Sequence, residues 1–413
     1  MRNRIQIAFD LGSYSIKGAV GRILPDDKIE ILSLSEIKST SIKNGDIIDK
    51  DLLLNHLEIL IEKMEKDSKV NIDEDAWVSI SGKGIKSINS STRIRSRDNA
   101  DFEINSEVKQ KLLDQCSDVM VSSDRYVLHN IERGYFIDDS PLIRNPIGMI
   151  GKSIDAKTHV IHVRNFNLSQ LDYCFKEDLG IETNPVFDGY ASATYNLSRD
   201  EKELGVIFVD IGADKTNLII FKDNYLIHSK VIPIGSSLVT KDMAAYLQTS
   251  LSESNRIKHE HISALSELTD DSEFFDVIVP NDELPKKVNK KEISKIAELR
   301  LEDIIDEIQD QIKSIGSEVE DFKSGIKISG GGSKVKNLDL LFRKHFTNIS
   351  VDYVNLKKIV FKENIEEKRE FSTLFGLLSW PLYNIEDKST NVSVKDIGGI
   401  RKSISSFWRE IFE

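Results

Sequence analysis

The stretch Ile5-Gln-Ile-Ala-Phe-Asp10-Leu-Gly12-Ser13-Tyr14-Ser15-Ile16-Lys17 decides the fold class. Its short, alternating apolar run ends in glycine and predicts a strand that enters a tight turn. Successive backbone N–H groups of such a turn bind phosphate oxygens, and glycine lets the ligand approach because it has no Cβ. Asp10 could hold hydrated Mg²⁺, while Ser13 supplies a hydroxyl and Lys17 a cation. Taken alone, the same residues would fit an ordinary β-hairpin equally well.

Two later segments repeat this pattern of a strand followed by a glycine turn. The first is Gly205-Val-Ile-Phe-Val-Asp210-Ile-Gly212-Ala-Asp-Lys215-Thr216-Asn217, and the second is Gly325-Ile-Lys-Ile-Ser-Gly330-Gly331-Gly332-Ser333. Two acidic turns about 200 residues apart could clamp a triphosphate from both sides, each with an aspartate near the metal. The third turn could lie flat against a purine and its ribose. This order predicts an internal duplication with a nucleotide site.

Bulk composition narrows the class of protein. The 413 residues exceed what one hydrophobic core usually supports, so several subdomains are expected. A formal charge of −12 argues against a surface built for nucleic acid. Cys116 and Cys174 have no CxxC spacing and suggest neither a disulfide framework nor a zinc site. No run approaches the roughly 20 apolar residues that span a bilayer, so any membrane contact is expected to be peripheral.

The segments between the turns predict a mixed α and β protein. Residues 84–163 differ in character from the rest and are interpreted as an inserted module, with a polar loop over Ser87–Asp101 and a helix over Glu107–Met120. A further helix is expected from about Ile293 to Ile315. Phe371–Tyr383 predicts an apolar helix that closes the folded part.

The succession of the three turns resembles the phosphate-1, phosphate-2 and adenosine motifs of the actin, Hsp70 and sugar-kinase superfamily. Neither a Walker A pattern nor GxGxxG is present. Within the superfamily, the chain resembles the FtsA family of bacterial cell-division proteins over nearly its whole length. The segments that carry the resemblance are Asp10–Gly18, Ser79–Gly84, Asn145–Gly148, Val231–Gly235, Gly330–Gly332 and Phe371–Leu378.

The resemblance implies an α/β fold of the actin type in which a subdomain called 1C, of the SHS2 type, replaces the usual 1B. The implied boundaries are 1–83 and 164–202 for subdomain 1A, 84–163 for 1C, 203–242 and 322–383 for 2A, 243–321 for 2B, 384–396 for a linker and 397–413 for a terminal helix. In the family, 1C mediates contacts between subunits and to later division proteins, and 2B receives the C-terminal peptide of FtsZ. Arg300 falls where the family places that FtsZ-facing surface, although a solvated helix cation explains it equally well.

The resemblance also implies a site for ATP and Mg²⁺ between 1A and 2A, with Asp10 and Asp210 holding the metal through water. Asp188 falls near the water-positioning residue of polymerising relatives, although an Asp-Gly turn explains it too. The residues implied in nucleotide binding are Asp10, Gly12, Ser13, Tyr14, Lys17, Asp210, Gly212, Ala213, Asp214, Lys215, Thr216, Gly235, Asn255, Lys258, Gly330, Gly331, Gly332 and Ser333.

Several of these positions depart from the family pattern. Ala213 and Asp214 stand where actin-like proteins usually have glycines, and Asp214 brings negative charge toward the phosphates. Asn255 replaces a glutamate that the purine-side helix often carries, whereas Lys258 matches the pattern. We therefore expect ATP binding with slow turnover, so that the chain is at most a slow ATPase.

The last residues predict a membrane-binding amphipathic helix. At helical spacing, one broad face carries Ile400, Ile404, Phe407, Trp408, Ile411 and Phe412, and the opposite side carries Arg401, Lys402 and Arg409. Aromatic side chains favour the headgroup boundary, and cations attract anionic lipid. Docking of this helix on the protein's own core is the alternative. A polymer that displays many such tails would bind a membrane firmly through avidity.

The sequence therefore favours an ATP-loaded, self-associating adaptor that tethers FtsZ filaments at the cytoplasmic face of the bacterial inner membrane. The expected partners are the C-terminal peptide of FtsZ, further copies of the chain in filaments or rings, anionic lipid and, through 1C, later division proteins, with no nucleic acid. A PilM-like scaffold of a pilus or secretion machine is the alternative within the fold. A sugar- or acetate-kinase-like phosphotransferase is disfavoured by the inserted module.

Overall fold

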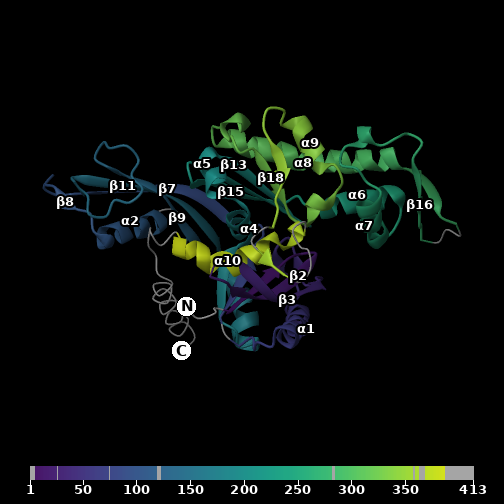
Figure 1. Ribbon diagram of the computed structural model, residues 1–413, viewed down its shortest axis with the longest axis horizontal. Helices are drawn as coiled ribbons and strands as arrows, with labels where there is room; N and C mark the ends of the chain where they lie inside the picture. Colours follow the sequence, from purple (N-terminus) through teal and green to yellow (C-terminus); the bar gives the residue numbers. More distant parts are fainter. Residues whose placement is uncertain are drawn as a thin grey trace.

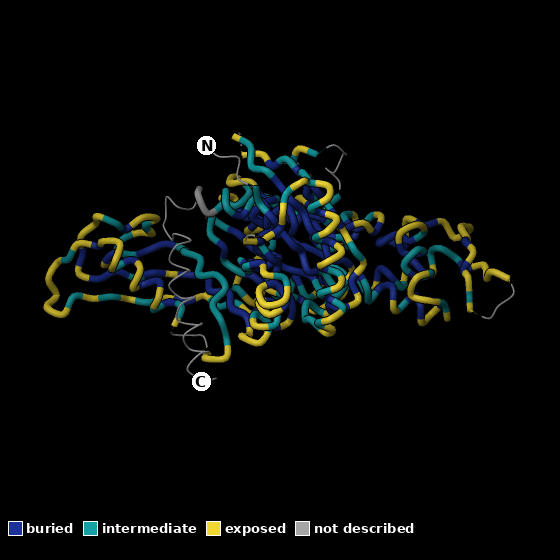
Figure 2. Tube along the Cα trace, turned by 90° about the horizontal axis from the view of Figure 1, so that it is seen from below, coloured by how far each residue is buried: buried dark blue, intermediate teal, exposed yellow. Residues whose placement is uncertain are grey.

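The computed structural model describes residues 5–386 apart from 26, 74, 119–121, 281–283, 357–358 and 362–367. Two central sheets are flanked by a smaller module at each end of the longest axis (Figure 1). Buried residues concentrate in the central part, and both ends carry more exposed residues (Figure 2). The predicted amphipathic helix lies outside the described residues, as does the predicted linker beyond residue 386.

The first central sheet has six strands in the order β12-β6-β1-β2-β3-β20. β1, β2 and β3 form an antiparallel meander, and β6 and β12 are added in parallel on the other side of β1. The helix α1 (Lys50–Ser68) packs on this meander and buries Leu53, Leu57 and Leu60. The strands are β1 (Ile5–Leu11), β2 (Ser15–Ile23), β3 (Ile29–Lys38), β6 (Ala76–Ile80), β12 (Thr183–Phe187) and β20 (Ile359–Val360).

The second central sheet repeats this topology in the order β15-β14-β13-β18-β19. β13, β14 and β15 again form an antiparallel meander, and β18 and β19 are added in parallel beside β13. The predicted internal duplication is therefore confirmed. The strands are β13 (Val206–Ile211), β14 (Thr216–Lys222), β15 (Tyr225–Ile232), β18 (Ile326–Ser329) and β19 (Val351–Tyr353).

Two helices, α4 (Asp188–Asn196) and α10 (Ser372–Glu386), connect the sheets. They pack closely because Gly376 has no side chain: a Cβ there would collide with the carbonyl oxygen of Ala191. α10 also contacts β1, β2 and β6, while α4 contacts β13 and β14. α10 runs to Glu386, past the predicted start of the linker at 384. Short elements nearby are β4 (Ile42–Lys43), β5 (Asp46–Ile47), α3 (Asn165–Asp172), α5 (Arg199–Leu204) and α9 (Leu338–His345).

The inserted module is a three-stranded antiparallel sheet, β7-β11-β9, covered by α2. The polar loop predicted over Ser87–Asp101 is wrong over most of its length, because Lys86–Arg95 form β7, which pairs with β11 along its whole length. Serine, asparagine and arginine fill most of this strand, so its period-2 alternation has few large apolar residues to mark it. The elements are β7, β8 (Phe102–Glu103), α2 (Ser106–Asp118), β9 (Arg125–Ile137), β10 (Ile150–Gly151) and β11 (Ser153–Arg164).

The module at the opposite end follows the second meander. The helix expected from about Ile293 to Ile315 is α8 (Lys290–Ser314), and its N-cap Asn289 accepts a hydrogen bond from the N–H of Glu292 at 3.1 Å. The other elements are α6 (Ser236–Leu247), α7 (Leu251–Glu260), β16 (Phe274–Val277) and β17 (Lys286–Asn289). Among the described helices, none has both the length and the apolar character that crossing a bilayer requires.

Candidate functional site

The first glycine turn joins β1 to β2 and sets Asp10 opposite Lys17 in the strand register. Both side chains are largely buried, and Lys17 Nζ lies 3.3 Å from Asp10 Oδ2. Asp10 Oδ1 accepts a hydrogen bond from Ser79 Oγ at 3.1 Å, and Ser79 Oγ accepts one from the N–H of Leu11 at 2.8 Å. The Asp10 carboxylate is therefore fixed in place, and its charge is compensated.

The apex of this turn consists of Gly12, Ser13 and Tyr14. A Cβ at Gly12 would lie 2.6 Å from the carbonyl oxygen of Ser15, so glycine is required for this turn. Tyr14 is exposed. The Ser13 hydroxyl lies near enough to the Asp214 carboxylate of the second turn to stabilise its negative charge. The two turns, far apart in sequence, are therefore in direct contact.

The second glycine turn joins β13 to β14 and rests on the N-terminus of α6. The N–H of Gly212 donates to the carbonyl oxygen of Lys215 at 2.8 Å and closes the turn. The N–H of Ser237, in the first turn of α6, donates to the carbonyl oxygen of Ala213 at 2.7 Å. Gly235 precedes α6, and a Cβ there would lie 2.5 Å from the Lys215 nitrogen. The turn is therefore held tightly against the helix.

Asp210, at the end of β13, is buried at the junction of the two sheets. The pKa of its carboxyl is raised to about 7, chiefly by burial and next by the nearby Asp188 carboxylate. Lys215 and Lys17 lower this pKa, whereas Asp10 raises it. The aspartates of both turns therefore lie within electrostatic reach of each other, which is the arrangement that the duplicated motif predicts.

The two turns differ in where they place lysine. Lys17 lies on β2 opposite the aspartate of its own turn, whereas the residue opposite Asp210 on β14 is Asn217. Lys215 lies in the turn itself and forms an ion pair with Asp188. Thr216 is buried at the start of β14. We expected the two turns to place an aspartate and a lysine in the same way. This is correct for Asp10 and Asp210 and wrong for Lys17 and Lys215.

Asp188 is the first residue of α4 and is buried beside Asp210. One of its oxygens accepts a hydrogen bond from the N–H of Gly189 at 2.8 Å, and the other pairs with Lys215. A carboxylate at a helix N-terminus is favourable because the helix dipole is positive there. The residue predicted to position water thus lies beside the predicted metal-binding aspartates, and its role in hydrolysis stays a prediction.

The third glycine turn packs directly on Asp210. Gly330 has a φ of 85°, and a Cβ there would collide with the Asp210 carboxylate. The hydroxyl of buried Ser333 donates to the carbonyl oxygen of Gly330 at 2.7 Å and fixes the turn. Gly331 has an open side, because the atom nearest to an added Cβ would be Glu370 Cβ at 3.8 Å. A flat, open glycine surface of this kind suits a purine and ribose.

A buried cation lies behind the second turn. Lys258, on α7, donates from Nζ to Thr240 Oγ1 at 2.9 Å and to the carbonyl oxygen of Ser236 at 3.3 Å. Burial lowers the pKa of its ammonium group to about 8. Buried cations with a shifted pKa are typical of ligand sites. Asn255 lies nearly one helical turn earlier on α7 and is half-buried.

The donor set around the junction fits hydrated Mg²⁺ and a phosphate chain. Within the described part of the chain, no group of three or more His, Cys, Asp or Glu side chains is arranged to hold a metal ion. Mg²⁺ usually keeps several of its waters and needs only one or two carboxylates. Asp10 and Asp210 are therefore consistent with the predicted contact through water.

Comparison with known proteins decides the family. Residues 207–376 match the family model "Cell division protein FtsA", and residues 82–162 match "SHS2 domain inserted in FTSA". Cell division protein FtsA of Pseudomonas aeruginosa is 27% identical over 396 residues, which cover 95% of this chain and 92% of that protein. The FtsA of Borreliella burgdorferi is also 27% identical, over 95% of this chain and 93% of its own length. The chain belongs to the FtsA family of cell-division proteins.

Solved structures of actin-like proteins share the fold. A chain of the PilM–PilN type IV pilus biogenesis complex superposes with a TM-score of 0.65 at 12% identity, over 90% of this chain and 97% of that one. MreB 5 of Spiroplasma citri bound to AMPPNP superposes with a TM-score of 0.56 at 14% identity, over 94% of this chain and 100% of that one. The predicted actin-type α/β fold with an SHS2-type insertion is thereby confirmed, while the exact subdomain boundaries stay predictions.

The predicted FtsZ-facing residue of this FtsA-family protein is engaged in ion pairs. Arg300, on α8, donates from Nε to Asp242 and from an Nη to Asp303, both at 2.7 Å. A groove lies beside it on α8, with the half-exposed Tyr246 and Leu299 among the residues that line it. Its lining residues are Tyr246, Ser266, Asp271, Asn289, Lys291, Glu292, Lys295, Ile296 and Leu299.

Sequence reasoning missed this groove. The signal that could have revealed it is a second apolar pair, Ile296 and Leu299, on α8. Ile296 packs only partly against the core, and the exposed Leu299 lies outside the buried stripe of Ile293, Ala297 and Leu301. A helix with apolar residues outside its core-facing stripe has surface left for a partner.

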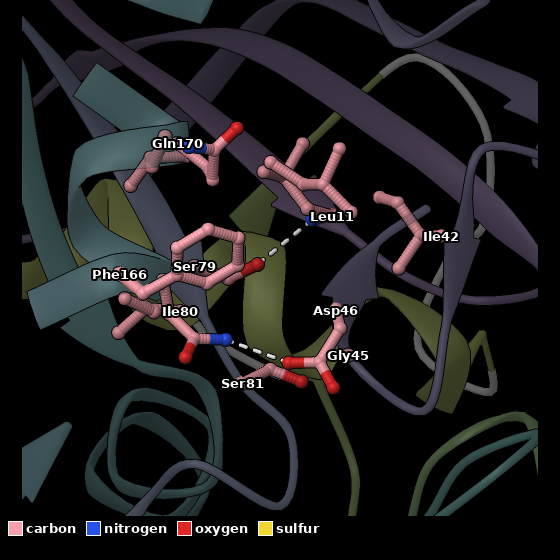
Figure 3. A pocket seen from close by; sticks show the side chains of 12 residues that line it. Leu11, Ile42, Gly45, Asp46, Ser79, Ile80, Ser81, Phe166 and Gln170 are labelled. Carbon is pink, nitrogen blue, oxygen red and sulfur yellow. Dashed lines mark hydrogen bonds between the residues drawn. The ribbon is translucent and has the colours of Figure 1, made fainter. Parts of the chain in front are cut away.

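A second, small recess lies beside the first glycine turn (Figure 3). Leu11, Ile80 and Phe166 supply apolar walls. At one side, Asn167 Nδ2 donates to Asp46 Oδ1 at 2.6 Å. Because Ser79 lines the recess and also holds Asp10, the recess adjoins the support of the predicted metal-binding carboxylate.

Proposed function

We propose that this FtsA-family protein binds ATP with Mg²⁺, assembles with further copies of itself and tethers FtsZ filaments to the cytoplasmic face of the inner membrane at the division site. The observation that carries the proposal is the meeting of Asp10 and Asp210, from the two duplicated turns, with Lys17 and Lys215 beside them. Carboxylates, ammonium groups and glycine turns are the donor set that a Mg²⁺–triphosphate complex requires.

The nucleotide would be held from both halves of the molecule. Asp10 and Asp210 would hold Mg²⁺ through water, and Mg²⁺ would neutralise charge on the phosphates. Gly331 and Lys258 would lie on the nucleoside side. Because Asp188 is engaged by Lys215, it is not free to orient water, which supports slow turnover. The ATP site would then act on assembly more than as a reaction centre.

The groove on α8 supports binding of the FtsZ C-terminal peptide. Tyr246 and Leu299 offer half-exposed apolar surface, and Lys291 and Lys295 place cations beside it. Fluorescence anisotropy with the labelled peptide should show that Leu299→Glu weakens binding about tenfold, because a charge replaces a buried apolar contact. The control is Lys313→Glu, which changes an exposed residue near the other end of α8. Equal loss in both variants would argue against this groove.

The inserted module supports contacts to other subunits and to later division proteins. It carries three exposed apolar side chains, Leu142, Met149 and Ile150, and Ile150, at the start of β10, is 66% exposed. Exposed apolar residues gathered on one module are typical of protein-binding surfaces. The partner of these residues would thus be another protein rather than lipid or nucleotide.

The amphipathic pattern of residues 400–412 supports membrane attachment. One such helix gives reversible binding, so assembly would strengthen it through avidity. The decisive experiment is co-sedimentation of the full chain and FtsZ filaments with anionic liposomes, with and without Mg²⁺–ATP. We expect FtsZ to pellet with the liposomes only when the protein is present, and more so with ATP. Trp408→Glu should abolish the effect; FtsZ recruitment by that variant would refute the tether.

A further inference from the structure

The carboxylate of Asp214 bridges the two halves of the molecule. Its Oδ1 accepts a hydrogen bond from Ser237 Oγ at 2.7 Å, at the start of α6 in the second half. Its Oδ2 accepts one from the backbone N–H of Asn44 at 3.1 Å, in the turn between β4 and β5 of the first half. The Ser13 hydroxyl, at the apex of the first glycine turn, lies near and stabilises the charge of the same carboxylate.

These three donors form a seat for an anion. One backbone N–H and two hydroxyls converge on a single carboxylate, and Lys241 adds positive charge nearby. Such a donor set suits a phosphate oxygen as well as a carboxylate oxygen. The seat lies at the contact between the two phosphate turns, because Ser13 belongs to the first turn and Asp214 to the second.

The Asn44 donor is held rigidly. Gly45 follows it with a φ of 82°, and a Cβ at Gly45 would lie 2.5 Å from Gly82 Cα. Gly82 itself has a φ of 99°. Two glycines in the left-handed region, packed backbone to backbone, fix the direction of the Asn44 N–H. The donor therefore stays aimed at the seat whichever anion occupies it.

Asp214 is ionised in this setting. Its pKa is lowered although burial opposes the charge, because the Ser237, Asn44 and Ser13 donors stabilise the carboxylate. A fixed negative charge in a phosphate-binding turn repels a phosphate chain. The carboxylate therefore occupies the hydrogen-bond donors and also repels a phosphate group.

We propose that Asp214 is an internal competitor for a phosphate group of the nucleotide. In the nucleotide-free protein its carboxylate accepts the Asn44 N–H, lies near the Ser13 hydroxyl and joins the two halves. Phosphate binding requires the carboxylate to release these donors, so nucleotide replaces one bridge between the halves with another. The inference rests on the proposed nucleotide site and adds a residue that sets its affinity.

The test compares the wild-type protein with Asp214→Asn and Asp214→Gly by calorimetry with Mg²⁺–AMPPNP. Both variants should bind AMPPNP about tenfold more tightly, because both lose the repelling charge and Asp214→Gly also frees the donors. Adenosine carries no phosphate, so its affinity should not rise. The matched control is Asp223→Asn, which makes the same charge change in the exposed turn between β14 and β15.

Hydrogen exchange without nucleotide gives an independent measurement. The peptide over residues 41–49 should exchange faster in Asp214→Gly, because the Asn44 N–H loses its acceptor. Equal AMPPNP affinity in all proteins, or unchanged exchange at 41–49, would overturn the inference and leave the nucleotide site in place. Failure of every protein to bind AMPPNP would overturn both this inference and the nucleotide part of the proposed function.

Discussion

At the scale of single residues, the junction of the two sheets concentrates charge of both signs in a buried space. Asp10 pairs with Lys17, and Asp188 pairs with Lys215, so two carboxylates are compensated directly. Within the described residues, Asp210 forms no such ion pair, and burial raises the pKa of its carboxyl. Uncompensated burial of a carboxylate costs stability when the group is ionised.

Replacing Asp210 by Asn should therefore stabilise the nucleotide-free protein, and more so at high pH. The folded-state pKa of about 7 exceeds the ordinary value of 3.8. Between these values the folded protein binds more protons than the unfolded chain, so its stability falls as pH rises. Chemical denaturation should show a gain about 2 kcal/mol larger at pH 8 than at pH 5. A gain that does not depend on pH would contradict this explanation.

Removing Lys215 should have the opposite effect. Lys215→Met leaves the buried Asp188 carboxylate without its ion-pair partner and should cost about 3 kcal/mol of unfolding free energy. Asp188→Asn in the same protein removes the uncompensated charge and should recover about half of that loss. A double-mutant cycle by urea denaturation measures the coupling. Strictly additive effects of the two substitutions would show that the pair makes no net contribution.

At the scale of elements, the three glycine turns serve different purposes. Gly12 and Gly235 are required by close backbone contacts, and Gly330 by the Asp210 carboxylate. Gly331 differs, because none of the described residues lies within 3.4 Å of an added Cβ and its φ is outside the left-handed region. Nothing in the fold itself requires glycine there. A ligand that packs flat on this turn would explain its presence.

Gly331→Ala should therefore weaken nucleotide binding without destabilising the fold. We expect the unfolding free energy to stay within about 1 kcal/mol of wild type, because the methyl group has room and alanine restrains the unfolded chain. Mg²⁺–AMPPNP affinity should fall at least tenfold if the nucleoside lies on this surface. Gly332→Ala is the contrasting variant, since its Cβ would collide with Ile211 and should destabilise the protein. Unchanged AMPPNP affinity in Gly331→Ala would place the nucleoside elsewhere.

Local pattern predicts elements well where large apolar residues mark the period. The strand ending at Asp10, its repeat ending at Asp210 and the long helix α8 all follow from such patterns. β7 was not predicted because serine and asparagine, rather than large apolar residues, occupy many of its positions, so no apolar alternation marks the strand. The aspartates of the site follow from their motif. The pairing of Lys215 with Asp188 and the bridge from Asp214 to Asn44 do not, because tertiary packing alone brings these residues together.

At the scale of the whole molecule, the inserted module is attached to both halves. On the side of the first sheet, His129 of β9 accepts a hydrogen bond from the N–H of Phe187 at 3.1 Å and packs against Trp380 of α10. On the side of the second sheet, His159 of β11 bonds through Nε2 to Ser229 Oγ of β15 at 2.8 Å. A change in the angle between the two halves would therefore strain or move the module.

Both attachments use a histidine that burial keeps neutral, which makes the whole molecule sensitive to acid. Burial lowers the pKa of His159 to about 3, and that of His129 also to about 3, from 6.5. Between pH 6.5 and pH 3 the unfolded chain takes up these protons and the folded protein does not. Each histidine therefore costs about 1.4 kcal/mol of stability for every unit that the pH falls in this range.

His159→Gln should remove one share of this acid sensitivity, because glutamine keeps a polar group at the attachment but does not titrate. Comparing unfolding free energies at pH 7 and pH 5, the wild-type protein should lose about 2 kcal/mol more than the variant. His129→Gln should remove a similar share. If His159→Gln kept the full loss between pH 7 and pH 5, the histidine would not be buried in its neutral form, and the attachment of the module to the second sheet would need another explanation.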